Sequence, residues 1–158
     1  MSDTAKPQQQ QQPFFGLEKI YLKDVSFESP NAPAVFMETQ APEVGVRIAI
    51  AHRSIDAAQG YYEVVVTVEI NAKREDKTIF LVNVDQAGVF RVQGVGSDTL
   101  ERTLEVTCAY VLLPFAREAV NELVMRGGFP QLLINPINFD ALYEQKAAAA
   151  KQPAKGQA

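Results

Sequence analysis

The stretch DTLERTLEVTCAYVLLPFAREAVNELVMR, residues 98–126, decides the fold. Its apolar residues recur at steps of three and four, the spacing that lines one face of an α-helix. They are Leu100, Leu104, Cys108, Val111, Leu112, Phe115, Ala116, Ala119, Val120, Leu123 and Val124. Because the apolar face broadens after Val111, we expect a sheet to cover one side of this helix and another subunit to cover the other.

Local signals predict the ends of this helix and a break within it. Asp98 is expected to cap the N-terminus, since Glu101 follows three residues later as in a capping box. Pro114 lacks a backbone donor, so we expect the helix to kink or split near Tyr110–Val111. The pair Gly127-Gly128 is expected to end the helix.

A second, short helix follows an extended segment marked by two prolines, FPQLLINPINF (129–139). Asn138 suits the N-cap of this helix, and Asp140 suits its first turn. Its apolar patch consists of Phe139, Leu142 and Tyr143. The alanine run after residue 146 either extends the helix or frays.

Upstream, alternating apolar residues predict four strands, at about 15–27, 44–50, 61–72 and 78–90. In the first strand the apolar side chains change parity twice, and each change implies a bulge or a bend. The pairs that mark these changes are Phe15 with Leu17, Ile20 with Leu22, and Val25 with Phe27. A long strand that is apolar on both faces is unsafe as a free edge, so we expect it to pair with a partner subunit.

The connections between these strands complete the expected fold. A polar loop at 52–60 and a charged turn at 73–77 are short, which implies an antiparallel meander with helices on one face. The fold class is therefore α+β. The connection at 29–43 is long and contains Val35, Phe36 and Met37. It is either a functional loop or a plain crossover whose apolar residues pack on the core.

Composition bounds the domain organisation of the 158 residues. A single domain is expected over 14–146, between disordered tails at 1–13 and 147–158 that lack apolar surface. Residues 14–143 contain 17 acidic and 11 basic side chains, a net charge of −6. This acidic balance argues against nucleic acid and anionic membranes as main partners and permits a basic protein partner. With one cysteine, no signal peptide and no long apolar run, we expect a cytoplasmic protein.

No pattern in the sequence predicts catalysis, a cofactor or a metal. The single histidine, His52, falls in the expected polar loop, so no histidine cluster can bind zinc. Cys108 lies on the apolar helix face, where a small core residue is the expected role. Phosphate-binding glycine motifs are missing, and the GVG run at 94–96 lacks the rest of such a pattern. Apolar residues in a long loop beside a short aromatic helix favour peptide binding instead.

Several segments together resemble the SecB family of export chaperones. They are YLKDVSFESPNAP (21–33), YYEVVVTVEI (61–70), FLVNVDQAGVF (80–90), LLPFAREAV (112–120) and RGGFPQLLINPINFDALY (126–143). The resemblance covers about residues 14–143. It implies a four-stranded antiparallel sheet with a long kinked helix and a short C-terminal helix. It also implies a dimer of dimers, joined through the first strands and then through the long helices, with an interface at Ile20, Leu22, Leu112, Phe115 and Val120.

The resemblance also implies a function. SecB chaperones hold precursor proteins unfolded without ATP and deliver them to the motor ATPase SecA. The client grooves are expected between the long loop, the sheet and the second helix, at Val35, Phe36, Val44, Val46, Phe139, Leu142 and Tyr143. For Phe139, anchoring of the second helix is an equal alternative.

The SecA contact of the family lies on the acidic outer face of the sheet. By motif match it carries over to Asp24, Glu28 and Leu81. Where the family often has an acid two residues after that leucine, this chain has Asn83, and Asp85 is the residue that could compensate. Without the resemblance, Asp24 and Glu28 would be ordinary surface charges.

Three other functions remain open at this point. One is a SecB-like chaperone dedicated to a toxin–antitoxin pair, although Asp24 and Glu28 favour the role linked to SecA. Another is a small-ligand-binding or enzymatic protein, which would need a polar, closed pocket. The last is a non-catalytic structural oligomer that binds neither clients nor SecA.

Overall fold

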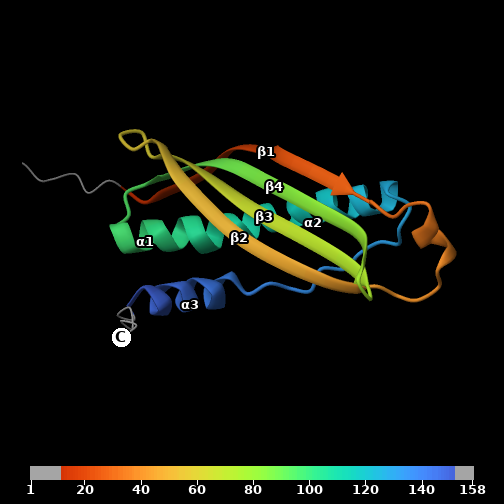
Figure 1. The fold of residues 1–158 in the computed structure, drawn as a ribbon. Coiled ribbons are helices and arrows are strands. Elements are labelled where there is room, and N and C mark those ends of the chain that lie inside the picture. The colour runs from red at the N-terminus through yellow and green to blue at the C-terminus, as the bar shows by residue number, and fades with distance from the viewer. Residues whose placement is uncertain (1–11, 152–158) are drawn as a thin grey trace, which may run out of the picture.

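The computed structural model describes residues 12–151 and contains one antiparallel four-stranded sheet (Figure 1). The strand order across the sheet is β1-β4-β3-β2, with β1 and β2 at the two edges. The strands are β1 (Phe14–Glu28), β2 (Glu43–Asp56), β3 (Tyr61–Arg74) and β4 (Lys77–Gln93). The expected meander of the last three strands is confirmed, and β1 extends it by pairing with β4.

The two irregularities expected in the first strand are present. The register between β1 and β4 shifts between Leu17 and Lys19, and again between Leu22 and Asp24. Each shift lies where the apolar side chains change parity, so the bulges return the apolar residues of β1 to the helix-covered face. The strand is therefore continuous over its full length despite the broken alternation.

β2 is longer than the sequence pattern predicts. The expected loop at 52–60 is wrong for its first half, because β2 continues to Asp56 and pairs with β3 from Glu43↔Lys73 to Asp56↔Tyr61. His52 accordingly lies in a strand, opposite Val64. Backbone pairing with β3 keeps these polar residues in the strand. Polar side chains are common on edge strands, since they discourage pairing with other chains.

The long helix spans three consecutive segments on one face of the sheet (Figure 1). They are α1 (Ser97–Arg102), the π-helical segment η2 (Thr103–Thr107) and α2 (Cys108–Arg126). The expected cap is wrong, because the helix begins at Ser97 with Gly96 at the N-cap position and no side-chain cap. The helix is not split at Pro114, since α2 continues through it and the departure from α geometry lies in η2 instead.

The C-terminal end of α2 has the hydrogen bonds of a Schellman motif. The Phe129 amide donates to the Val124 carbonyl at 3.1 Å, and the Gly128 amide donates to the Met125 carbonyl at 3.0 Å. Gly128 has a φ of +88°, a conformation that glycine adopts without steric cost. The chain then reverses into the extended segment 129–138, which we call the strap.

After the strap, α3 (Phe139–Lys151) begins where the sequence predicts. The Asn138 side chain accepts a hydrogen bond from the Ala141 amide at 3.0 Å, which confirms it as the capping residue. The alanine run extends the helix, so residues 147–151, expected as part of a tail, are helical. The rest of both expected tails, 1–11 and 152–158, lies outside the described residues.

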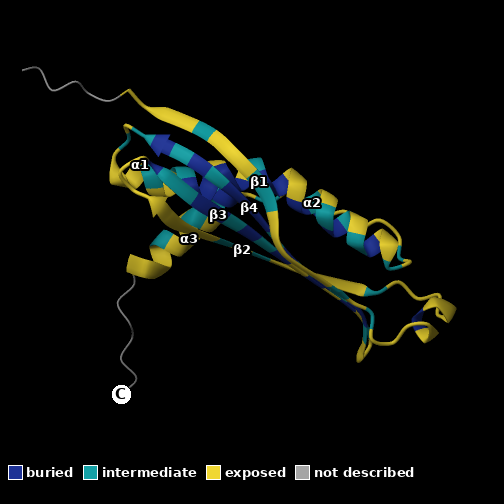
Figure 2. Ribbon diagram, turned by 90° about the horizontal axis from the view of Figure 1, so that it is seen from above, coloured by how far each residue is buried: buried dark blue, intermediate teal, exposed yellow. Residues whose placement is uncertain are grey.

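The core lies between β3, β4 and the long helix, where Figure 2 shows buried residues in the middle of the sheet. Every fourth residue of α2 faces the sheet and is buried: Cys108, Leu112, Ala116, Val120 and Val124. The expectation that Leu112 and Val120 contact another subunit is therefore wrong, because both are fully buried within this chain. Phe115, on a different row of the helix, is 43% exposed.

Candidate functional site: an apolar groove and an acidic sheet face

An apolar groove runs between β2, the strap and α3. Its first part is a depression of about 430 Å³. The lining residues are Val44, Val46, Ile48, Leu132, Leu133, Ile134, Asn135, Pro136, Ile137 and Leu142. A second depression of about 410 Å³ shares Ile48 and Leu142 with the first and continues along β2 toward the far end of α3. The shared residues join the two depressions into one groove.

Three of the seven residues predicted to contact clients line the first depression with partly exposed side chains. They are Val44 (38% exposed), Val46 (46%) and Leu142 (39%). Tyr143 lines the second depression. The alternation of β2 explains this arrangement, because Val44 and Val46 point to the helix-covered face while lying beyond the reach of the long helix.

The other three predicted residues lie elsewhere. Val35, in the short helix η1 (Ala34–Met37), and Phe139 are buried in the core and have no surface to offer a client. For Phe139 the anchoring alternative is therefore the correct one. Phe36 remains 46% exposed, but it packs against Phe129, with ring centroids 5.2 Å apart, in an aromatic cluster rather than among the lining residues of the groove.

None of the predicted client-binding residues lies in the strap, which contributes six of the ten residues that line the first depression. Leu133 is 85% exposed, while its neighbour Ile134 is buried. The run LLI between two prolines was the available signal, since proline keeps a segment extended and alternate side chains of an extended segment point to opposite sides.

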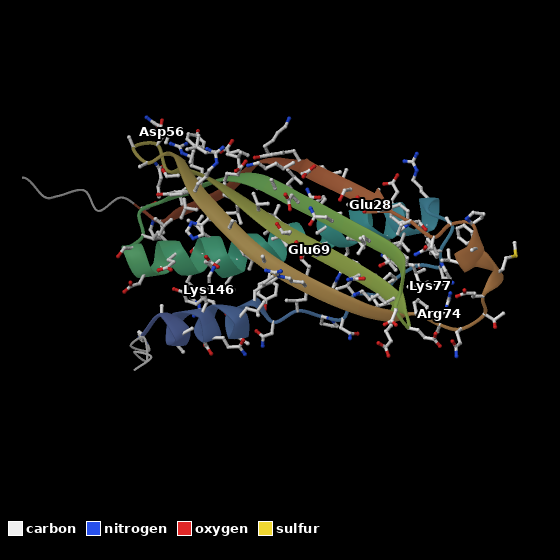
Figure 3. The ribbon with its side chains drawn as sticks, viewed as in Figure 1. Glu28, Asp56, Glu69, Arg74, Lys77 and Lys146 are labelled. Atoms are coloured by element: carbon white, nitrogen blue, oxygen red, sulfur yellow. The ribbon has the colours of Figure 1, made fainter. Side chains whose placement is uncertain are left out.

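Polar contacts fix α3, the third wall of the groove. Arg102 in α1 donates to the Asp140 carboxylate at 2.7 Å, and the Tyr110 hydroxyl lies 3.2 Å from the same carboxylate. Farther along, Lys146 reaches from α3 to Glu105 of η2 at 3.2 Å (Figure 3). His52 of β2 lies 3.2 Å from the same Glu105 carboxylate. Glu105, which is buried, therefore connects a strand, the long helix and α3.

The opposite face of the sheet carries the residues predicted to contact SecA. Glu28 pairs with Leu81 and Ser26 pairs with Asn83 in the ladder between β1 and β4, so Glu28, Leu81 and Asn83 point to one face. These three residues line a depression of about 530 Å³, together with Ser26, Gly45, Arg47, Glu69 and Asn71. Glu28 and Glu69 lie on this face in Figure 3.

Asp24 extends the same face along β1. It pairs with Asp85 of β4, whose carboxylate accepts a hydrogen bond from the Thr67 hydroxyl at 2.7 Å. Two carboxylates in directly opposite positions make this part of the face acidic. The four predicted residues thus come together on one surface, with Asp85 beside them.

Comparison with known proteins decides the family. The family model described as preprotein translocase subunit SecB matches residues 8–150. The protein-export protein SecB of Methylobacillus flagellatus is 45% identical over 152 residues, which cover 96% of each chain. That of Chromobacterium violaceum is 47% identical over 141 residues, covering 89% of this chain and 93% of the relative. The chain belongs to the SecB family.

A solved structure agrees with the SecB fold. The SecB-like chaperone Rv1957 of Mycobacterium tuberculosis, in complex with a ChAD peptide from the antitoxin HigA1, superposes with a TM-score of 0.65 at 17% identity. The match covers 78% of this chain and 91% of that one. The α+β fold and the family resemblance inferred from the sequence motifs are therefore both confirmed.

In this SecB-family chain, β1 lies at the edge of the sheet, as the first strand was expected to. Its helix-covered side leaves large apolar residues exposed, namely Phe15, Leu17, Leu22 and Val25, and Phe14 is exposed on the opposite face. Leu22 is 52% exposed, and Ile20 is partly buried against the core. An edge strand with this composition is a suitable surface for pairing with another chain.

Other features of the described residues bear on chemistry. Burial raises the pKa of the Cys108 thiol to about 12, which makes it a poor nucleophile. Within 12–151, no three side chains of histidine, cysteine, aspartate or glutamate gather closely enough to hold a metal ion. None of the helices in this range combines the length and the apolar character needed to cross a membrane.

Proposed function

We propose that this SecB-family chain holds precursor proteins unfolded in the cytoplasm and delivers them to SecA. The observation that carries the proposal is the open groove along β2, whose walls expose Val46, Leu133 and Leu142. An unfolded precursor exposes apolar side chains along an extended backbone, and a long, open groove can accept such a segment without requiring one sequence.

The free energy for holding comes from apolar burial, so no nucleotide is needed. Burying about 1,000 Å² of apolar client surface gives a gross gain of about 25 kcal/mol at ~25 cal/mol per Å². Ordering the client offsets much of this gain. Several grooves acting on one client raise the effective concentration of each further contact. The proposed unit is therefore an oligomer that presents several copies of the groove.

The proposed oligomer is a dimer of dimers. Two chains pair through β1, with Ile20 and Leu22 in the interface, and two such pairs meet through the long helices, with Phe115 between them. The exposed apolar side chains of β1 and α2 support this assembly. A Leu22→Lys variant is expected to run as a smaller species than the wild type in size-exclusion chromatography with light scattering.

The proposed contact with SecA is the acidic outer face of the sheet. Asp24 and Glu28 provide charge, and Leu81 provides an apolar contact. Asn83 lines the same depression as Glu28 and Leu81. A basic segment of the motor is the complementary partner. We expect Asp24→Lys with Glu28→Lys to abolish SecA binding in calorimetry, while Glu144→Lys, on α3, leaves it unchanged.

A role dedicated to a toxin–antitoxin pair is the second candidate. The M. tuberculosis neighbour was solved with an antitoxin peptide, but it shares 17% identity with this chain, whereas export proteins share 45% and 47%. The export role is therefore favoured. A purified antitoxin that binds this chain in preference to secretory precursors would reverse the order.

The test of holding is the aggregation of a slow-folding secretory precursor diluted from denaturant, followed by light scattering. We expect the wild-type chain to suppress scattering at about one tetramer per precursor, equally with and without ATP. Val46→Ser should weaken the suppression. Ile55→Ser, on the same strand and similarly exposed but outside the groove, is the matched control. A folded wild-type chain that does not suppress scattering would contradict the proposal.

A further inference from the structure

The strap, residues 129–138, forms one wall of the groove but has no regular structure of its own. No backbone–backbone hydrogen bond joins residues 130–137 to the rest of the described chain, 12–151. In a strand or a helix, such bonds fix the backbone and therefore the directions in which the side chains point. The position of this wall must therefore be set by side chains that reach the strap from elsewhere.

Two side chains of α2 make that connection. The Asn121 side-chain oxygen accepts a hydrogen bond from the Leu132 amide at 3.2 Å. The Arg117 guanidinium donates to the Asn135 carbonyl at 3.4 Å. Arg117 and Asn121 are four residues apart, so they lie one above the other on the same face of the helix. Together they hold the strap at two backbone positions, on either side of Leu133 and Ile134.

Backbone anchors of this kind determine which strap side chains enter the groove. In an extended segment, fixing the backbone at two points also fixes the sides to which the intervening residues point. Ile134 is accordingly buried against the core, while Leu133 is 85% exposed at the groove. A rotation of the strap would exchange these positions and change the apolar surface that faces Val44 and Val46.

Arg117 has a further feature that packing alone does not explain. Its Nε atom is buried and has no hydrogen-bond partner within the described residues. A buried donor without a partner costs free energy, which an aliphatic side chain at this position would avoid. The guanidinium is nevertheless placed where it reaches the strap carbonyl.

We propose that Asn121 and Arg117 are positioning residues that hold the strap and thereby set the width and apolar lining of the client groove. The proposal rests on the proposed function, since it assigns these residues a role in client binding. Neither side chain needs to touch the client. Asn121 is the main anchor, because its bond is the shorter of the two and satisfies a partly buried amide.

Three variants of the full chain test this role. Asn121→Leu removes the acceptor, Asn121→Asp retains one, and Glu122→Gln changes an exposed neighbour on α2 that lies outside the groove lining. The probe is a fluorescein-labelled peptide with leucine at alternate positions and serine between them. We expect Asn121→Leu to weaken peptide binding about fivefold, the effect of one hydrogen bond. Asn121→Asp and Glu122→Gln should bind as the wild type does.

A double-mutant cycle separates positioning from a general loss of stability. If Asn121 acts through Leu133, the effect of Asn121→Leu on peptide binding should largely disappear in a Leu133→Ala background. Amide exchange should show faster exchange of Leu132 in Asn121→Leu, with the exchange of β3 and β4 unchanged. Arg117→Met, which removes the other anchor, provides a second variant if Asn121→Leu does not fold.

The outcomes distinguish this proposal from the proposed function. If Asn121→Leu binds the peptide as tightly as the wild type does, although its Leu132 amide exchanges faster, the positioning role alone is overturned. Full additivity of Asn121→Leu with Leu133→Ala also overturns it. A wild-type chain that binds no peptide overturns the proposed function, and the positioning role with it.

Discussion

The carboxylate of Glu63 on β3 accepts a hydrogen bond from the hydroxyl of Tyr21 on β1, across the intervening strand β4. Ala87 of β4, the direct ladder partner of Tyr21, has a small, buried side chain that leaves room for this crossing. Lys23 also reaches Glu63, at 2.7 Å, and Arg53 of β2 reaches it at 2.9 Å. One buried carboxylate thus connects both edge strands to the centre of the sheet.

Replacement of Glu63 should destabilise the sheet. We expect Glu63→Gln to lower the free energy of unfolding by about 1–3 kcal/mol, because hydrogen bonds to a charged group are lost and their donors are left without an anionic acceptor. Glu69→Gln on the same strand is the control. Glu69 is exposed and 3.8 Å from Arg47, so its loss should cost less than about 0.5 kcal/mol. Urea titrations of both variants compare the two costs, and equal costs would contradict the role of Glu63.

The same carboxylate predicts how stability depends on pH. Burial raises the pKa of Glu63, but hydrogen bonds from Lys23, Tyr21 and Arg53 outweigh it and lower the pKa from 4.5 to about 2. Because the folded-state pKa lies below the unfolded one, this contribution is present above pH 4.5 and is lost as the pH falls toward about 2. The gap in stability between the wild type and Glu63→Gln should therefore narrow across this window. A gap that stays constant would count against the lowered pKa.

Glu105 should control the attachment of α3. It is buried in the π-helical segment and contacts both His52 and Lys146, so its removal leaves both without their acidic partner. We expect Glu105→Ala to increase amide exchange in the second half of α3 by several-fold, while the first half stays protected by the contact between Arg102 and Asp140. Lys151→Ala, at the end of the same helix, is the control. Uniform loss of protection along α3 would show that Glu105 has no separate role.

The thiol of Cys108 should resist modification in the folded chain. Burial raises its pKa to about 12, and the side chain has no exposed surface, so both the thiolate and access to it are limited. Labelling by a thiol reagent should be slow in buffer and complete within the mixing time in denaturant. Fast labelling of the native chain would show that the core opens near η2.

The sequence predicted the sheet well because its signals are local. Alternation in β3, the parity changes in β1 and the cap at Asn138 each depend on neighbouring residues, and each agrees with the structure. The predicted end of β2 and the predicted start of the long helix were wrong, because neither depends on neighbouring residues alone. Pairing with β3 extends β2 through polar residues, and the helix begins at Ser97 without a side-chain cap.

The candidate site was predicted in part, because burial depends on contacts between distant segments. Val46 and Leu142, two of the predicted client-binding residues, line the groove, since strand and helix periodicity show which way they point. Val35 and Phe139 have the same apolar character, but both are buried in the core. Leu133 was missed, because the short run LLI between two prolines predicts alternation but does not show which of its side chains the core covers.

The contrast between Phe139 and Leu142, three residues apart on α3, separates stability from binding. Phe139 is fully buried, with its ring 5.0 Å from that of Tyr110, so Phe139→Ala should cost about 3–5 kcal/mol of unfolding free energy. Leu142 is 39% exposed in the groove, so Leu142→Ser should cost far less stability and instead weaken client binding. Thermal unfolding and the aggregation assay measure the two effects separately. If Leu142→Ser suppresses aggregation as well as the wild type does, this part of the groove does not contact clients.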